Sequence, residues 1–134
     1  KKIKIMILLD AYDCLIKNKS INYELIKLLN SFDVNIIVLT NASKFQYEEF
    51  GFELIPYPIF SFHQNPTKLD PKYFEFLIKH MFLNPENIIY VEHSKKAIQV
   101  ANQFGFKCFH FEYENGSIKD LEIFLNETKI YKVD

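Results

Sequence analysis

The sequence contains no arginine, because all sixteen of its basic residues are lysine. A bidentate guanidinium clamp for a phosphate or carboxylate group is therefore excluded, and an anion site must use lysine or neutral donors. Acidic and basic residues nearly balance, with a formal net charge of −1. That balance gives no electrostatic footprint for nucleic acid or for an anionic membrane surface.

Cysteine is also scarce. The two cysteines, Cys14 and Cys108, lie far apart and match no metal-binding or redox spacing. The sequence shows no signal-peptide pattern and no apolar run of transmembrane length. We therefore expect a reduced, cytoplasmic protein.

The apolar content is high enough for a sizeable core. The chain has 134 residues, of which 49% are apolar, and this length is typical of one domain. The sequence contains no internal repeat, low-complexity segment or linker. We predict a single domain over residues 1–134.

Short apolar segments alternate with amphipathic segments along the chain. The run that ends at Asp10 is rich in β-branched residues, which predicts a strand buried on both faces of a parallel sheet. Pro56 and Pro58 interrupt residues 53–62, where we expect a short strand with irregular flanks. Residues 11–20 are expected to form a loop or short flap. The other predicted strands are 35–40, 87–91 and 106–111, with an edge strand at 130–133, and the predicted helices are 21–32, 43–50, 70–81, 95–104 and 117–126.

Capping residues support these helices. Ser20 is placed to cap the first helix, Gly51 to end the second, and Asp70 with Pro71 to begin the third. The alternation of strands and helices predicts an α/β fold. Its architecture is a three-layer α/β/α sandwich with a mainly parallel, doubly wound, Rossmann-like sheet.

Polar residues follow directly after three predicted strands. Because the carboxyl ends of parallel strands meet at one edge of a sheet, we expect these residues to share a crevice with Lys68, which precedes a helix. A carboxylate, a hydroxyl and an ammonium group suit nucleophilic displacement at an anionic substrate, since the last two can hold charge that develops on oxygen. The residues that follow the strands are Asp10, Thr40, Asn41, Glu92 and His93.

Four segments resemble, in order and spacing, the motifs of the haloacid dehalogenase-like (HAD) hydrolase superfamily. Residues 9–15, Leu-Asp-Ala-Tyr-Asp-Cys-Leu, resemble its first motif, a strand followed by Asp-x-Asp-Gly-Thr-Leu. Residues 39–41, Leu-Thr-Asn, resemble the second, a strand ending in Ser/Thr-Asn. Residues 68–71, Lys-Leu-Asp-Pro, resemble the Lys-Pro-Asp-Pro pattern of the third. Residues 90–94, Tyr-Val-Glu-His-Ser, resemble the fourth, a strand followed by Gly/Asp-Asp-Ser and a later acid.

This resemblance implies a HAD-type core and hydrolysis of a phosphoric ester. Asp10 would be the nucleophile and would form an aspartyl-phosphate or aspartyl-ester. Thr40 and Lys68 would bind the transferring group, with Asn41 in support. The family holds Mg²⁺ with the first Asp, a main-chain carbonyl two residues on, and the acid of the fourth motif.

The first motif departs from the family pattern. Tyr12 stands where the family has its general acid/base, and a phenol with a pKa of ~10 is poorly suited to that role near neutral pH. Asp13 stands where the family has glycine. Asp13 could supply the missing carboxylate only if the loop differs by about one residue.

The fourth motif departs as well. The metal-binding acid falls on His93, and the later acid falls on Ala97. Imidazole is a soft ligand for Mg²⁺, which prefers hard oxygen ligands. Glu92 is the nearby replacement, although neighbouring residues of a strand point to opposite faces. The candidate metal ligands are therefore Asp10, Glu92 and His93, and we interpret the site as either rewired or silent.

Two functions remain open. The first is a phosphohydrolase, without a cap domain, that acts on a phosphorylated small molecule or macromolecule. The second is a catalytically silent module that binds a phosphorylated ligand or a protein. A tyrosine also stands two residues after the nucleophile in the metal-independent 2-haloacid dehalogenases, but those rely on a helical cap and an arginine, so we do not expect dehalogenation here. The short spacing between the motifs leaves no room for a cap, so either the substrate is large or a second subunit or a protein partner covers the site. The remaining histidines, His63, His80 and His110, are expected in loops or on the surface.

Overall fold

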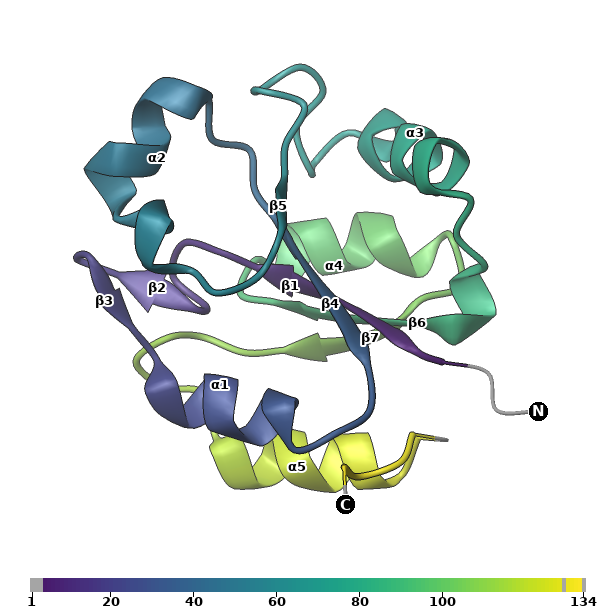
Figure 1. The fold of residues 1–134 in the computed structure, drawn as a ribbon. Helices are drawn as coiled ribbons and strands as arrows, with labels where there is room; N and C mark the ends of the chain where they lie inside the picture. Colours follow the sequence, from purple (N-terminus) through teal and green to yellow (C-terminus); the bar gives the residue numbers. More distant parts are fainter. Residues whose placement is uncertain (1–3, 129, 134) are drawn as a thin grey trace.

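The fold is a five-stranded parallel β-sheet between two layers of helices, as seen in a computed structural model that describes residues 4–128 and 130–133 (Figure 1). The strand order is β5-β4-β1-β6-β7, so β1 lies at the centre, between β4 and β6. This confirms the predicted α/β architecture. The strands of the sheet are β1 (Met6–Asp10), β4 (Asn35–Leu39), β5 (Ile59–Phe60), β6 (Ile88–Glu92) and β7 (Lys107–His110).

Helices cover both faces of the sheet. Figure 1 shows α1 beside α5 on one face and α3 near α4 on the other. The described helices include none that is both long and apolar enough to cross a membrane. They are α1 (Tyr23–Asn30), α2 (Lys44–Phe50), α3 (Pro71–Met81), α4 (Lys95–Asn102) and α5 (Ile118–Asn126), with short 3-10 helices η1 (Phe52–Leu54) and η2 (Pro85–Asn87).

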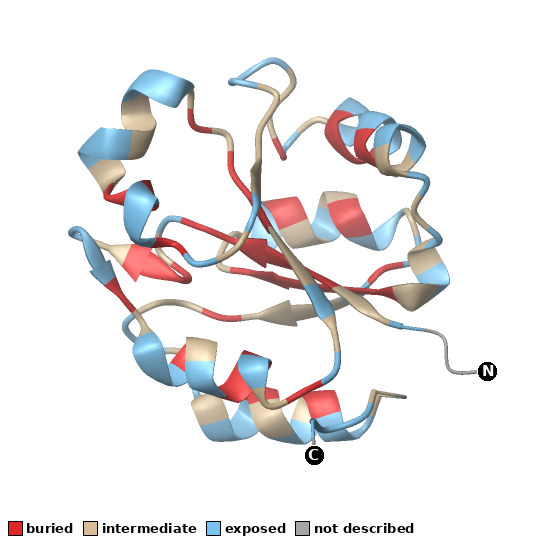
Figure 2. Cartoon of the chain, in the orientation of Figure 1, coloured by how far each residue is buried: buried red, intermediate tan, exposed pale blue. Residues whose placement is uncertain are grey.

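Strand β1 is buried on both of its faces, which explains its unbroken apolar run (Figure 2). Ile7 and Leu9 pack in the cluster that includes residues of α1 and α5, whereas Leu8 packs in the cluster that includes residues of α3 and α4. The alternation follows from the two-residue period of a strand. Each leucine buried in this way contributes about 1.5–3 kcal/mol of transfer free energy.

The predicted caps hold for two helices and fail for one. Asp70 accepts a hydrogen bond from the Lys72 backbone N–H and caps α3, while Gly51 ends α2 with a left-handed φ of 78°. The cap of α1 is Asn22, not Ser20. Ser20 is instead paired in a small hairpin, which extends the chain by two residues before the helix begins.

Two loop regions take a definite form. Residues 11–20 fold as a tight turn that leads into the hairpin of β2 (Ile16–Lys17) and β3 (Ser20–Ile21), in agreement with the predicted flap. The predicted edge strand at 130–133 does not join the five-stranded sheet. Lys132 makes an isolated antiparallel bridge with Phe32, which follows α1.

Candidate active site

A pocket of about 350 Å³ opens at the carboxyl edge of the sheet. Asp10 ends β1 and Glu92 ends β6, while Thr40 directly follows β4, so residues at the carboxyl ends of three adjacent strands meet in one place. This is the crevice that the strand pattern predicts. Of the predicted site residues, the pocket is lined by Asp10, Tyr12, Thr40, Asn41, Lys68, Glu92 and His93.

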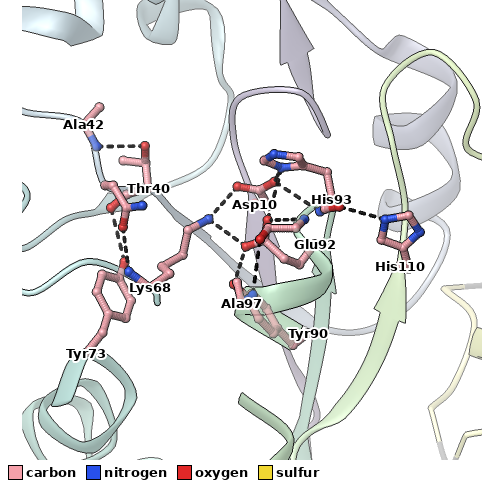
Figure 3. A network of polar contacts seen from close by, with 12 residues as sticks. Asp10, Thr40, Ala42, Lys68, Tyr73, Tyr90, Glu92, His93, Ala97 and His110 are labelled. Carbon is pink, nitrogen blue, oxygen red and sulfur yellow. Dashed lines mark hydrogen bonds and ion pairs between the residues drawn. The ribbon is translucent and has the colours of Figure 1, made fainter. Parts of the chain in front are cut away.

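Lys68 joins two carboxylates at the base of this pocket (Figure 3). Its Nζ lies 2.6 Å from Asp10 Oδ1 and 2.7 Å from Glu92 Oε1, and all three residues are buried. The backbone N–H of Lys68 donates to Asn41 Oδ1 at 2.9 Å. Asn41 therefore positions the lysine, as a supporting residue would.

His93 contacts the other side of the Asp10 carboxylate. Its Nδ1 makes a hydrogen bond with Asp10 Oδ2, and its backbone N–H donates to the same oxygen at 3.3 Å. The same Nδ1 lies 3.1 Å from Glu92 Oε2. Asp10 is thus held between Lys68 and His93, which come from different segments of the chain.

Glu92 and His93 both reach Asp10, contrary to the expectation that neighbours point to opposite faces. Strand β6 ends at Glu92, so the alternation of the strand does not extend to His93. Within the strand the alternation does hold, because the Tyr90 hydroxyl, two residues earlier, hydrogen-bonds Glu92 Oε1. The Ser94 backbone N–H donates to Glu92 Oε2 at 3.0 Å.

Burial, charge and hydrogen bonds shift the pKa values of the four ionisable groups in this cluster, which are Asp10, Lys68, Glu92 and His93. Burial and the charge of Glu92 raise the pKa of Asp10 to about 6. Burial alone would raise the pKa of Glu92, but the charge of Lys68 and hydrogen bonds from His93 and Lys68 hold it well below its usual range. Hydrogen bonds to Asp10 and Glu92 raise the pKa of His93 to about 10. Burial would lower the pKa of Lys68, but the two carboxylates keep it above its usual range. At neutral pH the cluster therefore holds two negative and two positive charges.

Thr40 presents its hydroxyl to the pocket. Its Oγ1 accepts a hydrogen bond from the Ala42 backbone N–H at 3.1 Å, and its carbonyl accepts one from the Tyr73 hydroxyl at 3.2 Å. A hydroxyl that accepts one bond can still donate its own hydrogen. Thr40, which lines the pocket, can therefore donate a hydrogen bond to an acceptor there.

The turn after β1 places the side chains of Tyr12 and Asp13 in different surroundings. Tyr12 lines the pocket, with 38% of its surface exposed, and its ring packs 5.0 Å from that of Phe50. Asp13 does not line the pocket and instead lies 3.4 Å from Lys17 Nζ. Its left-handed backbone, with a φ of 66°, belongs to a turn closed by a hydrogen bond from its N–H to the Ile16 carbonyl. The prediction that Asp13 could supply the missing carboxylate is therefore not supported by its position.

His110 was expected to be a surface or loop residue, but it supports the site. Its Nε2 lies 2.7 Å from the His93 backbone carbonyl, and it must donate, because a carbonyl only accepts. His110 ends β7, which pairs with β6. Its place at the carboxyl end of a predicted strand was the signal in the sequence that could have identified it.

The three candidate metal ligands do gather. Donor atoms of Asp10, Glu92 and His93 lie within 4.8 Å of one another. The set does not fit Mg²⁺, however, because the carboxylate oxygens already accept from ammonium, imidazole, hydroxyl and amide donors. A nitrogen that bridges two carboxylates carries a hydrogen, so it has no lone pair for a metal.

Comparisons with known proteins identify the fold. No protein-family profile matches the sequence, and no curated protein matches it. Solved structures do match. A protein from Porphyromonas gingivalis, designated by prediction as a HAD-like family hydrolase, has a TM-score of 0.70 at 12% identity over 95% of this chain and 100% of its own.

Two further structures are similar. One is the core domain of a protein from Streptococcus pneumoniae TIGR4 with a provisional designation as a phosphoglycolate phosphatase, at TM-score 0.61 and 15% identity over 95% of this chain and 98% of its own. The other is 3-deoxy-D-manno-octulosonate 8-phosphate phosphatase from Moraxella catarrhalis, in complex with magnesium, phosphate and its sugar acid. It has a TM-score of 0.54 at 11% identity over 91% of this chain and 85% of its own. At these identities the likeness shows that the chain has the HAD-like core fold.

Proposed function

We propose that this chain, whose fold is that of the HAD-like core, is a phosphohydrolase in which Asp10 is the nucleophile. The observation that carries the proposal is the position of the Asp10 carboxylate. It lies at the end of the central strand, lines the pocket, and is 2.6 Å from the ammonium group of Lys68. A carboxylate in that place can attack a phosphorus atom while Lys68 and Thr40 hold the phosphoryl oxygens.

The reaction would proceed in two displacements. A carboxylate oxygen of Asp10 attacks phosphorus, the bond from phosphorus to the ester oxygen breaks, and the departing oxygen takes a proton from solvent water. Water then attacks the same phosphorus and gives its proton to the solvent, the bond from phosphorus to Asp10 breaks to restore the carboxylate, and inorganic phosphate leaves. Each carboxylate oxygen has two lone pairs, so Asp10 can keep its contacts with Lys68 and His93 while it attacks.

Protonation of the departing oxygen is the weak step. Tyr12 lines the pocket where a carboxylic acid would serve the family, and a phenol is a poor proton donor near neutral pH. General acid catalysis typically contributes about 10²–10⁴-fold. We therefore propose a slow enzyme, most active on esters whose alcohol is a good leaving group.

The substrate would be a phosphate monoester that reaches an open site. This follows the names of two structural relatives, a phosphoglycolate phosphatase and a sugar-acid 8-phosphate phosphatase. The rings of Tyr12 and Phe50 give the pocket an aromatic wall, which favours an ester with an apolar or aromatic group. The chain would act as a single domain without a cap, with a large substrate, a second subunit or a protein partner covering the rim.

A silent module that binds a phosphorylated ligand or a protein is the second candidate. Its support is that the Asp10 carboxylate is already paired on both oxygens and that Tyr12 replaces an acid. Such a module would bind inorganic phosphate through Thr40 and Lys68 without turning over an ester. The fold alone does not choose between the two functions.

The deciding experiment compares the wild type with Asp10→Asn on a panel of aryl and alkyl phosphate monoesters. We expect the variant to lose about 10³-fold or more of kcat/KM, because an amide cannot act as the nucleophile. Asp13→Asn is the matched control, since it makes the same chemical change outside the pocket. It should keep activity within about twofold. A wild-type rate no higher than that of Asp10→Asn would favour the silent module.

A further inference from the structure

The side chain of His93 lies against both carboxylates of the site. In the resemblance to the HAD superfamily, its position belongs to the acid that holds Mg²⁺ beside the nucleophile. Figure 3 shows the imidazole against the Asp10 carboxylate, on the side away from Lys68. Its Nδ1 contacts Asp10 Oδ2 and lies 3.1 Å from Glu92 Oε2. The ring nitrogen therefore stands where a cation between the two carboxylates would stand.

The carboxylate oxygens of Asp10 and Glu92 already accept hydrogen bonds, which leaves few free oxygen ligands for a divalent ion. Mg²⁺ requires about six oxygen ligands in near-octahedral geometry at about 2.0–2.1 Å. To accept it, Asp10 and Glu92 would have to give up hydrogen bonds with His93 or Lys68. Both carboxylates are almost completely buried, so solvent does not replace those partners.

The charges also balance without a metal. A carboxylate and the Mg²⁺ that it binds carry −1 and +2, which sum to +1. A protonated histidine carries +1, so the replacement preserves the formal charge beside Asp10. Nδ1 of His93 lies between Asp10 Oδ2 and Glu92 Oε2, and two neighbouring carboxylates favour the charged form of the ring. The hydrogen bond from His110 Nε2 to the His93 backbone carbonyl, at 2.7 Å, helps to hold this segment in place.

We propose that the His93 imidazolium replaces the metal-binding acid and its divalent cation, so that the Asp10 site works without a metal. The claim that hydrolysis needs no metal rests on the proposed function, in which His93 would offset the charge on Asp10 and on the bound phosphoryl group. The claim that the site does not bind Mg²⁺ is independent of turnover. The chain has exchanged a metal site for a fixed organic cation.

Calorimetric titration with Mg²⁺ tests the binding half. The wild type should give no saturable heat up to about 10 mM Mg²⁺, whereas His93→Asp should bind Mg²⁺ at least about tenfold more tightly, because it frees the cation position and supplies an oxygen ligand. His80→Asp is the matched control, because it makes the same change on an exposed face of α3 and should behave as the wild type. Saturable binding of Mg²⁺ to the wild type that is lost in Asp10→Asn would overturn the proposal.

Turnover in the presence of EDTA tests the catalytic half. With any ester that the wild type hydrolyses faster than Asp10→Asn does, we expect EDTA and added Mg²⁺ to change kcat/KM by less than about twofold. A rate that falls more than about tenfold in EDTA and returns with Mg²⁺ would overturn the proposal.

The two halves keep the two proposals apart. If no ester is hydrolysed, the phosphohydrolase proposal fails, while the titration of wild type and His93→Asp still decides whether His93 replaces a metal. If His93→Asp does not fold, because a third carboxylate crowds Lys68, the wild-type titration decides alone. In that case, wild-type binding of Mg²⁺ that is lost in Asp10→Asn contradicts the inference, and no saturable binding supports it.

Discussion

Lys68 and His93 offset the free-energy cost of burying the two carboxylates of this site. Asp10 and Glu92 are both nearly inaccessible to solvent, and an unpaired carboxylate in such a place costs several kcal/mol. Lys68 contacts both acids, and so does His93. The arrangement is an alternating set of two anions and two cations, in which each cation offsets the repulsion between the acids.

The protonation of His93 predicts how stability depends on pH. His93 binds its proton more tightly in the folded chain, with a pKa raised from 6.5 to about 10, so its stabilisation is complete below pH 6.5 and is lost as pH rises through about 10. The pKa of Asp10 is raised from 3.8 to about 6, so its titration lowers the stability of the folded chain as pH rises between those values. Above neutral pH, Asp10 contributes no further change in stability.

We therefore expect the thermal midpoint of the wild type to fall between pH 7 and pH 10 by more than that of His93→Gln. Because about a third of the His93 side chain is exposed, solvent screening reduces the effect. We expect the protonated ring to contribute about 1 kcal/mol to the free energy of unfolding at pH 7, which corresponds to about 3–5 °C in the thermal midpoint. The comparison removes the contributions of lysines and tyrosines that titrate in both proteins. Equal slopes would mean that the ring is neutral in the folded chain.

Helix α3 determines where Lys68 sits. The lysine lies two residues before Asp70, whose carboxylate caps the helix by accepting from the Lys72 N–H at 2.9 Å. On the same helix, Tyr73 is fully buried and hydrogen-bonds the Thr40 carbonyl. A secure start of α3 therefore positions a cation as well as a structural element.

The cap of α3 should be measurable by substitution. Asp70→Ala should lower the free energy of unfolding by about 1 kcal/mol, because the first turn loses its side-chain acceptor. Asp70→Asn should cost less than half as much, since an amide oxygen accepts the same bond and only the favourable charge near the helix start is lost. Urea denaturation of the two variants tests this. Equal losses would mean that charge, rather than the cap, accounts for the effect.

The whole molecule is built around one central strand. Strand β1 pairs with β4 and β6, packs against helices on both faces, and ends in the proposed nucleophile. Because all five strands run the same way, the segments that follow β4, β5 and β6 bring Thr40, Lys68 and His93 to the pocket that Asp10 lines. The stability of the sheet and the assembly of the site thus depend on the same element.

A cavity in β1 should therefore be costly. Leu8 is fully buried, and Leu8→Ala should lower the free energy of unfolding by about 2–5 kcal/mol. Leu54→Ala is the control, because Leu54 is 49% exposed and its truncation should cost no more than about 0.5 kcal/mol. Urea denaturation checks both. Similar losses for the two variants would contradict the central place of β1 in the core.

The sequence by itself determined the α/β class, the central buried strand and the edge of the sheet at which the site lies. These follow from local patterns: apolar runs set the strands, Asp70 and Gly51 mark helix ends, and parallel strands direct Thr40 and Asp10 to one edge. Such signals act within a few residues, so they can be read without knowing the fold. Six of the seven predicted residues that line the pocket were identified in this way, whereas Tyr12 was identified by the resemblance of residues 9–15 to the first HAD motif.

Only the tertiary structure decided which partners these residues take. Asp10 meets Lys68 across 58 positions of sequence and His93 across 83, and nothing local to either residue states that contact. Asp13 leaves the site because the turn after β1 directs it toward Lys17, and His93 reaches Asp10 because β6 ends one residue earlier. Ion pairing depends on distances of a few ångströms between separate segments, and those distances are settled by packing of the whole chain.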